Sequence, residues 1–265
     1  MKHATADGLV INAYERNGSV YLSVLTADEG RMTLLAKGAK SIKNDQMSVS
    51  QLFTYANFEY YTKGDTRILK GGSVHRSFFD VSSDLVASSL ASYLCELATE
   101  LTGEGEEAHE ILRLLLNSLH AGAEGLYPLE KIKAAFELRA ATLSGYAPDV
   151  GGCALCGSDA AEELYLDVMN GSCVCSDCRA KRNAVRRAEE QYEDLREADL
   201  LCRLTPSAYA AFCYVTGAPL SRLLAFELAD PEDARLFYHA AEVYLLSHLG
   251  HGFRTLDFYK TVAEM

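Results

Sequence analysis

Cysteines are the residues of this chain whose spacing is best suited to chemistry. Four of its eight cysteines form two C-x-x-C pairs, Cys153/Cys156 and Cys175/Cys178, with 18 residues between the pairs. A C-x-x-C turn presents two thiolates to one metal ion, and Zn²⁺ prefers four such ligands in a tetrahedron. The length of the insert between the pairs is typical of a zinc ribbon. We therefore predict that these four cysteines bind one Zn²⁺ ion.

A fifth cysteine, Cys173, lies just before the second pair and leaves another ligand set open. It would pair with Cys175 or Cys178, although C-x-C makes a poorer metal-binding turn than C-x-x-C. An iron–sulfur cluster is the alternative metal centre. Four thiolates fill the shell that zinc prefers and leave no position for water, so we predict a structural site. The remaining cysteines lie in apolar segments with a helical pattern and are predicted to be core residues: Cys95, Cys202 and Cys213.

Motifs for other enzyme chemistries are missing from the sequence. It contains no Gly-rich phosphate-binding loop, no dinucleotide-binding fingerprint and no nucleophile elbow. The zinc-deaminase pattern is missing as well, because Val174 rather than proline precedes Cys175 and no H-x-E occurs. The sequence therefore predicts a protein that is not an enzyme.

The first 80 residues carry cations in a pattern that indicates nucleic-acid binding. Cations that follow a phosphate backbone, with aromatic side chains that stack on bases, are the usual means of binding a single strand. The predicted DNA-binding residues are Arg31, Lys37, Lys40, Lys43, Arg67, Lys70 and Arg76, and the interleaved aromatic residues are Tyr55, Phe58, Tyr60 and Tyr61. In the alternative interpretation, half of the aromatic residues fill a barrel core and the lysines are only solvated.

A second basic run, RAKRNAVRR at 179–187, directly follows the last predicted zinc ligand. It either extends the DNA-binding track or neutralises the acidic stretch at 189–197 through i, i+4 pairs. The residues concerned are Arg179, Lys181, Arg182, Arg186 and Arg187.

The distribution of charge separates the two ends of the chain. The net charge is −12, but residues 1–80 have ten Lys and Arg against eight Asp and Glu. Residues 81–150 and 151–265 each have a net charge of −7. We therefore expect one end that tolerates polyanions and a larger body that repels them.

Neither secretion nor membrane insertion is predicted. The N-terminal MKHATADGLV has no apolar segment of the signal-peptide type, and the longest apolar run, at 208–220, is too short to span a bilayer. A cytoplasmic protein is expected, and in that compartment paired C-x-x-C motifs indicate a metal site rather than disulfides.

The elements that must position these residues fall into an α+β order. Five short strands are predicted at 8–14, 20–26, 31–37, 51–61 and 66–74, which favours an OB-fold barrel over an SH3-like barrel. Helical periodicity follows, with N-cap and Pro signals at Thr205-Pro206 and Asp230-Pro231. The predicted domains are an OB-fold at 1–80, helices at 81–150, a zinc-binding insert at 151–182 and helices at 183–265.

Four stretches of the sequence resemble the RecO family of bacterial recombination mediators. They are LTADEGRMTLLAKGAK (25–40), AAFELRAATLSGYAPDVGGCALCG (134–157), CSDC (175–178) and HLGHGFRTLDFY (248–259). The resemblance implies an OB-fold, a helical bundle and a zinc-binding insert. By position, Lys37 and Lys40 match the family's basic Ala-Lys-Gly segment, and the four cysteines match its zinc ligands.

The resemblance also implies a function. Such a protein binds single- and double-stranded DNA, anneals complementary strands and assists RecA loading on DNA coated by single-strand-binding protein. The implied partners are RecR, the C-terminal tail of single-strand-binding protein, and RecF, and the implied location is the nucleoid. The competing hypothesis is a zinc-ribbon scaffold that binds only proteins.

One departure from the family pattern bears on DNA affinity. The segment after Ala-Lys-Gly is often rich in arginine in the family, but here it reads AKSIKNDQ. Lysine lacks the planar fork with which arginine holds phosphate, so weaker intrinsic binding is expected. We therefore expect a partner to complete the DNA-binding surface.

Overall fold

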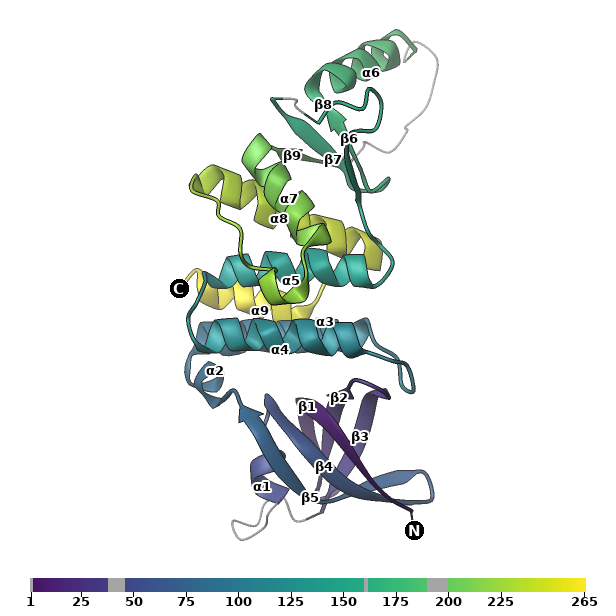
Figure 1. The fold of residues 1–265 in the computed structure, drawn as a ribbon, viewed down its shortest axis with the longest axis vertical. Helices are drawn as coiled ribbons and strands as arrows, with labels where there is room; N and C mark the ends of the chain where they lie inside the picture. Colours follow the sequence, from purple (N-terminus) through teal and green to yellow (C-terminus); the bar gives the residue numbers. More distant parts are fainter. Residues whose placement is uncertain (1, 38–45, 160–161, 190–199) are drawn as a thin grey trace. The chain divides into compact units, whose positions relative to one another are not determined.

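A computed structural model describes residues 2–37, 46–159, 162–189 and 200–265 (Figure 1). The chain divides into two compact units, which are described separately. Unit 1 comprises Met1–Leu126 and Phe253–Met265, and unit 2 comprises Tyr127–Gly252. The four domains expected from the sequence remain a prediction. The two compact units group the helices and strands differently.

Unit 1 begins with a closed barrel of five strands. The strands are β1 (Lys2–Arg16), β2 (Ser19–Thr26), β3 (Gly30–Ala36), β4 (Thr54–Lys63) and β5 (Thr66–Ser77). Their order around the barrel is β1-β2-β3-β5-β4, in which only the β3–β5 pair is parallel. This confirms the predicted fold class, a five-stranded OB-type barrel followed by helices.

Strand β1 is longer than its sequence pattern indicated. It pairs with β4 from Lys2 to Leu9 and with β2 from Gly8 to Arg16, with a shift in register between Val10 and Asn12. Its first residues contain few β-branched or aromatic side chains, so a local pattern does not reveal them. The long-range pairing with β4 establishes them as a strand.

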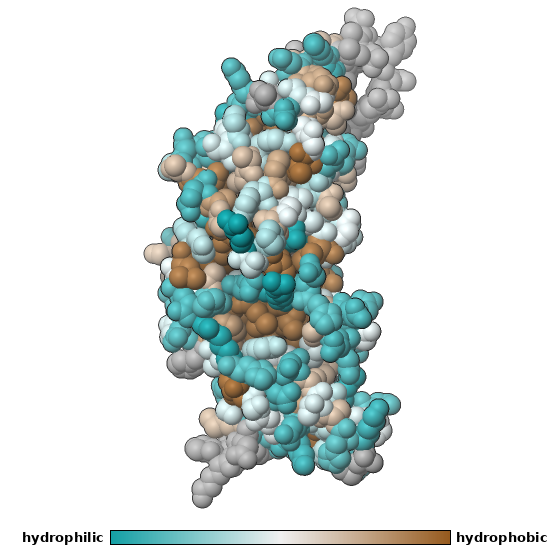
Figure 2. All heavy atoms as spheres, in the orientation of Figure 1, coloured by the Kyte–Doolittle hydropathy of each residue, from teal (hydrophilic) through white to brown (hydrophobic). Residues whose placement is uncertain are grey.

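Alternation along the strands separates the barrel core from its outer face. The core contains Val10, Leu22, Val24, Met32, Leu34, Ala36, Val49, Ala56, Phe58, Tyr60 and Leu69. Val49 comes from the short helix α1 (Gln46–Val49), whose Gln46 side chain donates to the carbonyl oxygens of Leu69 and Lys70. Hydrophilic to neutral residues predominate on the face of the barrel that is visible at the bottom of Figure 2.

Four helices complete unit 1: α2 (Phe79–Ser83), α3 (Leu85–Glu100), α4 (His109–Ala123) and α9 (Arg254–Ala263). The last of these was not predicted as a helix. It packs along α3, where the rings of Tyr93 and Phe253 lie 5.6 Å apart and Thr255 donates a hydrogen bond to Glu96. The C-terminal segment therefore belongs to the same unit as the barrel.

The β2–β3 turn is joined to the acidic loop between α3 and α4. Gly30 forms a β-bridge with Glu104, and the backbone N–H of Arg31 donates to the carbonyl of Gly103 at 3.1 Å. At Gly30, φ is +59°, and an added Cβ would lie 2.3 Å from the carbonyl oxygen of Gly103. Both the backbone conformation and the lack of space therefore require glycine at this position.

We expect Gly30→Ala to destabilise unit 1 by more than the ordinary penalty of a left-handed residue, which is about 1–3 kcal/mol. Gly64 provides a matched control, because its φ is also +59° but nothing lies within 4 Å of its virtual Cβ. Urea unfolding of both variants separates the steric clash from the conformational penalty. Equal losses in the two variants would show that the contact with Gly103 is unimportant.

The helices α5 (Leu129–Leu143), α7 (Pro206–Gly217) and α8 (Pro231–Leu249) pack together in unit 2, with a 3-10 turn at Leu220–Arg222. The N-caps expected at Thr205 and Asp230 are confirmed, because their side chains accept from the N–H groups of Ala208 and Glu232. Gly250 ends α8 at a φ of +75°. Across the described part of the chain, every helix is too short or too polar to span a membrane.

A four-stranded sheet forms the rest of unit 2. Its strands are β6 (Asp149–Cys153), β7 (Leu164–Asp167), β8 (Ser172–Cys175) and β9 (Leu201–Leu204), in the order β6-β8-β7-β9. Helix α6 (Ser176–Glu189) follows β8 directly. The charged pattern of residues 181–201 predicts a helix; residues 181–189 are helical as part of α6, but Leu201 begins strand β9. Tyr209 anchors the sheet to α7 by donating to the carbonyl of Val150 at 2.6 Å.

Candidate metal centre and nucleic-acid surface

The four predicted zinc ligands lie on two adjacent strands and the turns that follow them. Cys153 ends β6, and Cys156 lies in the turn after it. Cys175 ends β8, and Cys178 lies in the first turn of α6. Since β6 and β8 are parallel neighbours, both C-x-x-C segments are at the same end of the sheet.

The four sulfur atoms are close enough to share one ion. All lie within 4.8 Å of one another, and the Sγ atoms of Cys156 and Cys175 are 3.8 Å apart. In a tetrahedral site with Zn–S bonds of about 2.3 Å, neighbouring sulfurs are about 3.8 Å apart. The donor set therefore fits Zn²⁺. When bound, the ion would supply a fixed cross-link between the two turns.

Backbone N–H groups donate hydrogen bonds to two of the four sulfurs, which favours the thiolate form that binds a cation. The N–H of Cys175 donates to the sulfur of Cys153 at 3.3 Å, and that of Cys178 donates to the sulfur of Cys175 at 3.4 Å. Burial raises the pKa of Cys153, but backbone hydrogen bonds outweigh it and lower the pKa to about 6. Donation to the sulfurs of Cys175 and Cys156 raises the pKa of Cys178 to about 12. Without metal, Cys153 therefore loses its proton more readily than Cys178, and a bound cation would displace the protons that remain.

Cys173 lies outside the cluster of four. It is fully buried on β8, and burial raises its pKa to about 12. Cys95 and Cys202 are buried as expected, but Cys202 lies on strand β9 rather than on a helix. Cys213, on α7, is only half-buried, so its assignment to the core was too simple.

The basic run after the metal ligands is partly engaged inside unit 2. The guanidinium of Arg179 lies 4.0 Å from the ring centroid of Tyr165, and Arg182 is 3.8 Å from a carboxylate oxygen of Asp167. Lys181 is exposed. The side chains of Arg186 and Arg187 lie outside the described residues, as does most of the acidic stretch. Neither role predicted for this run is therefore tested.

On the barrel, the predicted arginines are held by neighbouring groups. Arg67 forms an ion pair with Glu29 at 2.9 Å, and Arg76 forms one with Glu124 at 2.7 Å. Arg31 is half-buried beside the acidic α3–α4 loop. The two ion pairs reduce the positive charge that Arg67 and Arg76 present to a polyanion.

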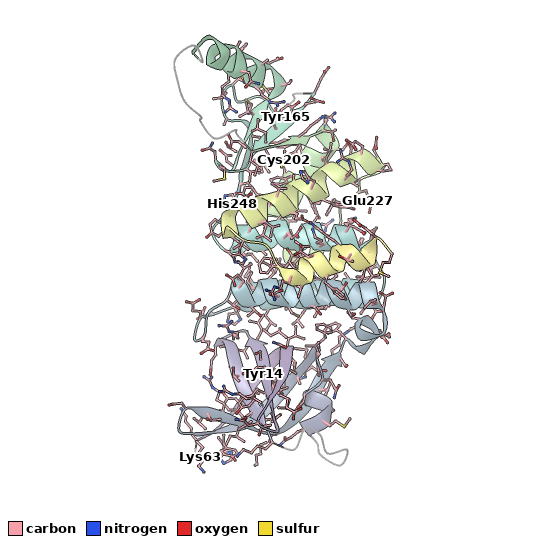
Figure 3. The ribbon with its side chains drawn as sticks, turned by 180° about the vertical axis from the view of Figure 1, so that it is seen from behind. Tyr14, Lys63, Tyr165, Cys202, Glu227 and His248 are labelled. Carbon is pink, nitrogen blue, oxygen red and sulfur yellow. The ribbon has the colours of Figure 1, made fainter. Side chains whose placement is uncertain are left out.

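The lysines of the barrel are more accessible. Lys37 and Lys70 are exposed, and neither forms an ion pair within the described ranges. The parallel pairing of β3 with β5 directs both lysines toward the same end of the barrel. Lys40 and Lys43 lie outside the described residues. Lys63, labelled in Figure 3, is a further exposed lysine at the end of β4.

The aromatic residues of β4 divide between the two faces of the barrel. Phe58 and Tyr60 are 0% and 4% exposed and belong to the core, so they cannot stack on bases. Tyr55 and Tyr61 face outward and contact the rings of His75 and His3. The structure therefore corrects the predicted stacking surface. It reveals another exposed aromatic residue, Tyr14. Its alternation with the polar residues Asn12 and Arg16 could have predicted an outward-facing ring.

Two family models match the chain. The model described as "Recombination protein O N terminal" matches residues 1–78, and that described as "Recombination protein O C terminal" matches residues 82–192. The first covers the barrel and the second covers all four clustered cysteines.

Curated proteins named "DNA repair protein RecO" are similar to this chain over much of its length. One from Acetivibrio thermocellus is 25% identical over 264 residues, which cover 99% of this chain and 98% of the relative. One from Clostridium acetobutylicum is 22% identical, covering 87% of the chain and 86% of the relative. One from Halalkalibacterium halodurans is 30% identical over 58% of the chain and 60% of the relative.

Proposed function

We propose, because this chain belongs to the RecO family, that it is a non-enzymatic recombination mediator in DNA repair. It binds single- and double-stranded DNA, anneals complementary strands and, with RecR, assists RecA loading on DNA coated by single-strand-binding protein. Its other proposed partners are the tail of that coating protein and RecF, and it works at the nucleoid. The family models over residues 1–78 and 82–192, together with a relative that is similar over 99% of the chain, carry this proposal.

The barrel supports the DNA-binding part of the proposal. Lys37, Lys63 and Lys70 are exposed, and none of them has an ion-pair partner among the residues that the structure describes. Cations that are not neutralised by neighbouring carboxylates release counterions when they approach phosphates. Arg67 and Arg76, which are already paired with carboxylates, contribute less.

The four-cysteine centre has a structural part in this proposal. One Zn²⁺ per chain fixes the turns at Cys153 and Cys175 and so orients the start of α6, which carries Arg179 and Lys181. Full coordination by sulfur leaves the ion no open position for catalysis.

Lys37→Ala and Lys70→Ala should each weaken DNA binding at all sequences. Each variant should also reduce the slope of log K against log salt by about 1, since one phosphate contact is lost. Fluorescence anisotropy between about 50 and 200 mM salt measures this slope. Arg235→Ala is the control, because Arg235 is exposed on α8 and pairs with Glu232. Unchanged slopes in both lysine variants would remove these residues from the DNA interface.

The same measurement, repeated with RecR, tests the function as a whole. Because the basic segment is poor in arginine, RecR is expected to increase the affinity for DNA. An absence of binding to any DNA, with RecR present, would favour the protein-binding scaffold. Tight, salt-insensitive binding by the isolated chain would contradict a surface that a partner completes.

A further inference from the structure

The outer face of the first hairpin carries a stacked pair of tyrosines. Tyr14 on β1 and Tyr21 on β2 are directly opposite in the register, with ring centroids 5.4 Å apart and ring planes 10° apart. Tyr14, labelled on the barrel in Figure 3, is 45% exposed. An offset stack of this kind stabilises a hairpin, and that is its ordinary role.

The surroundings of the pair leave a ring accessible. Beyond Leu9, β1 no longer pairs with β4, and β2 is its only strand partner among the described residues, although the N–H of Phe53 still donates to the carbonyl of Val10. In the described part of the chain, no strand therefore lies beside Tyr14 on the side away from Tyr21. On the side away from Tyr14, Tyr21 lies opposite Leu35 of β3.

Two exposed cations belong to the next row of the same face. Arg16 follows Tyr14 by two positions and lies opposite Ser19, and Lys37 continues β3 just beyond Ala36, the partner of Val20. Strand spacing puts the two cations about 10 Å apart, with the tyrosine rings about 7 Å away along the strands. Glu15 belongs by alternation to the opposite face of β1.

We propose that Tyr14 and Tyr21 form a stacking platform for an unpaired base of single-stranded DNA. Arg16 and Lys37 hold the phosphates that flank this base. The inference rests on the proposed DNA-binding function and names the residues that favour single strands over duplexes. Aromatic faces bind unpaired bases of any sequence, because every base has a π-face.

Duplex DNA should not use this platform. Its bases are already stacked on one another, so an exposed tyrosine ring meets only the backbone. Loss of Tyr14 therefore affects the binding of single strands, whereas loss of Arg16 or Lys37 affects both forms of DNA. This difference separates a stacking residue from a residue that acts through charge.

The test compares Tyr14→Ala and Tyr14→Phe on three probes: oligo-dT, an abasic oligonucleotide of equal length, and a duplex. Tyr14→Ala should weaken oligo-dT binding about tenfold, within the range of about fivefold to 150-fold for one stacked base. Tyr14→Phe keeps the ring and should bind like the original chain. Both variants should bind the abasic strand and the duplex unchanged. Tyr146→Ala is the control, because Tyr146 is 39% exposed in unit 2.

A fluorescent reporter gives an independent readout. The chain contains no tryptophan, so Tyr14→Trp introduces a single indole at the platform. Its emission should be quenched by oligo-dT and left unchanged by the abasic strand. Circular dichroism and thermal unfolding of each variant show whether the barrel remains folded.

Three results would overturn the platform. They are full oligo-dT affinity in Tyr14→Ala, an equal loss of affinity on all three probes, and an indole that does not respond to oligo-dT. In each of these cases the original chain still binds DNA, so the proposed function survives. If the original chain binds no DNA, even with RecR, the proposed function and the platform fail together.

Discussion

Cys175→Ser is expected to lose the bound zinc and to unfold the ribbon, whereas Cys173→Ser keeps about one zinc per chain. The sulfur of Cys175 lies 3.8 Å from that of Cys156 and accepts the N–H of Cys178. Removing this thiolate takes away one of four ligands, and a hydroxyl is a poor replacement for zinc. Structural zinc contributes about 10–16 kcal/mol in small peptides, so its loss should be decisive for a small sheet.

Cys173 makes the comparison sharp. It lies two residues from Cys175 on the same strand and is fully buried, but it is not part of the sulfur cluster. The same Cys→Ser change therefore tests ligation rather than the general effect of a hydroxyl in this sheet. Burying a hydroxyl should cost about 1–3 kcal/mol while the metal is retained.

Metal content and local protection are the two measurements. Zinc per chain should fall to near zero in Cys175→Ser, and amide exchange over β6, β8 and the start of α6 should become rapid. Protection in unit 1 should not change, since it contains none of the four ligands. Equal loss of zinc from both variants would mean that Cys173 is a ligand. Retention of iron in place of zinc would favour the cluster alternative.

The metal site was predictable because its spacing is local. Each C-x-x-C turn depends on only four consecutive residues, so the sequence alone identified all four cysteines that the fold brings within 4.8 Å. The barrel was predictable for a similar reason, because apolar alternation in β2 and β3 matches their burial. Helical periodicity likewise predicted helices within residues 81–150, where α3, α4 and α5 lie.

Long-range contacts explain what the sequence did not reveal. Strand β9 lies in a segment with helical charge pattern, and only pairing with β7 makes it a strand. The roles of the barrel cations depend on partners far along the chain, as between Arg76 and Glu124. Likewise, Phe58 and Tyr55 share one strand and one chemical character, but the pleat sends them to opposite faces.

Lys133→Met should destabilise unit 2 by about 3–5 kcal/mol. Lys133 lies on α5, and its Nζ is 2.9 Å from Glu137 and 2.6 Å from Glu242 of α8. The side chains of Lys133 and Glu137 are 7% and 0% exposed. The variant leaves a buried carboxylate without this ammonium group, and desolvated charge is expensive.

The stability that Lys133 contributes should depend on pH in a characteristic way. Burial lowers the pKa of Lys133, but Glu137 and Glu242 outweigh it and raise the pKa above 10.5. A raised folded pKa means that this contribution is complete below pH 10.5 and is lost as pH rises through the folded value. The original chain should therefore lose stability above pH 10.5, and Lys133→Met should lack this component.

The acid side should show the opposite trend. In Lys133→Met the two glutamates repel each other in a buried site, which raises their pKa values. Lowering the pH toward about 4.3 neutralises them, so the deficit relative to the original chain should narrow. Urea unfolding at several pH values measures both trends. Arg235→Met is the control, because its pair with Glu232 is exposed and should contribute at most about 1 kcal/mol.

A double variant, Lys133→Met with Glu137→Met, then separates the net contribution of the ion pair to stability from the cost of a buried carboxylate that has lost its ammonium partner. Replacing a buried ion pair by apolar groups of similar volume is often neutral, whereas removing one partner is costly. We therefore expect the double variant to recover most of the stability lost in Lys133→Met. If Lys133→Met itself stays within about 1 kcal/mol of the original chain, the contacts of Lys133 with the two glutamates do not contribute the stability expected of a buried ion pair.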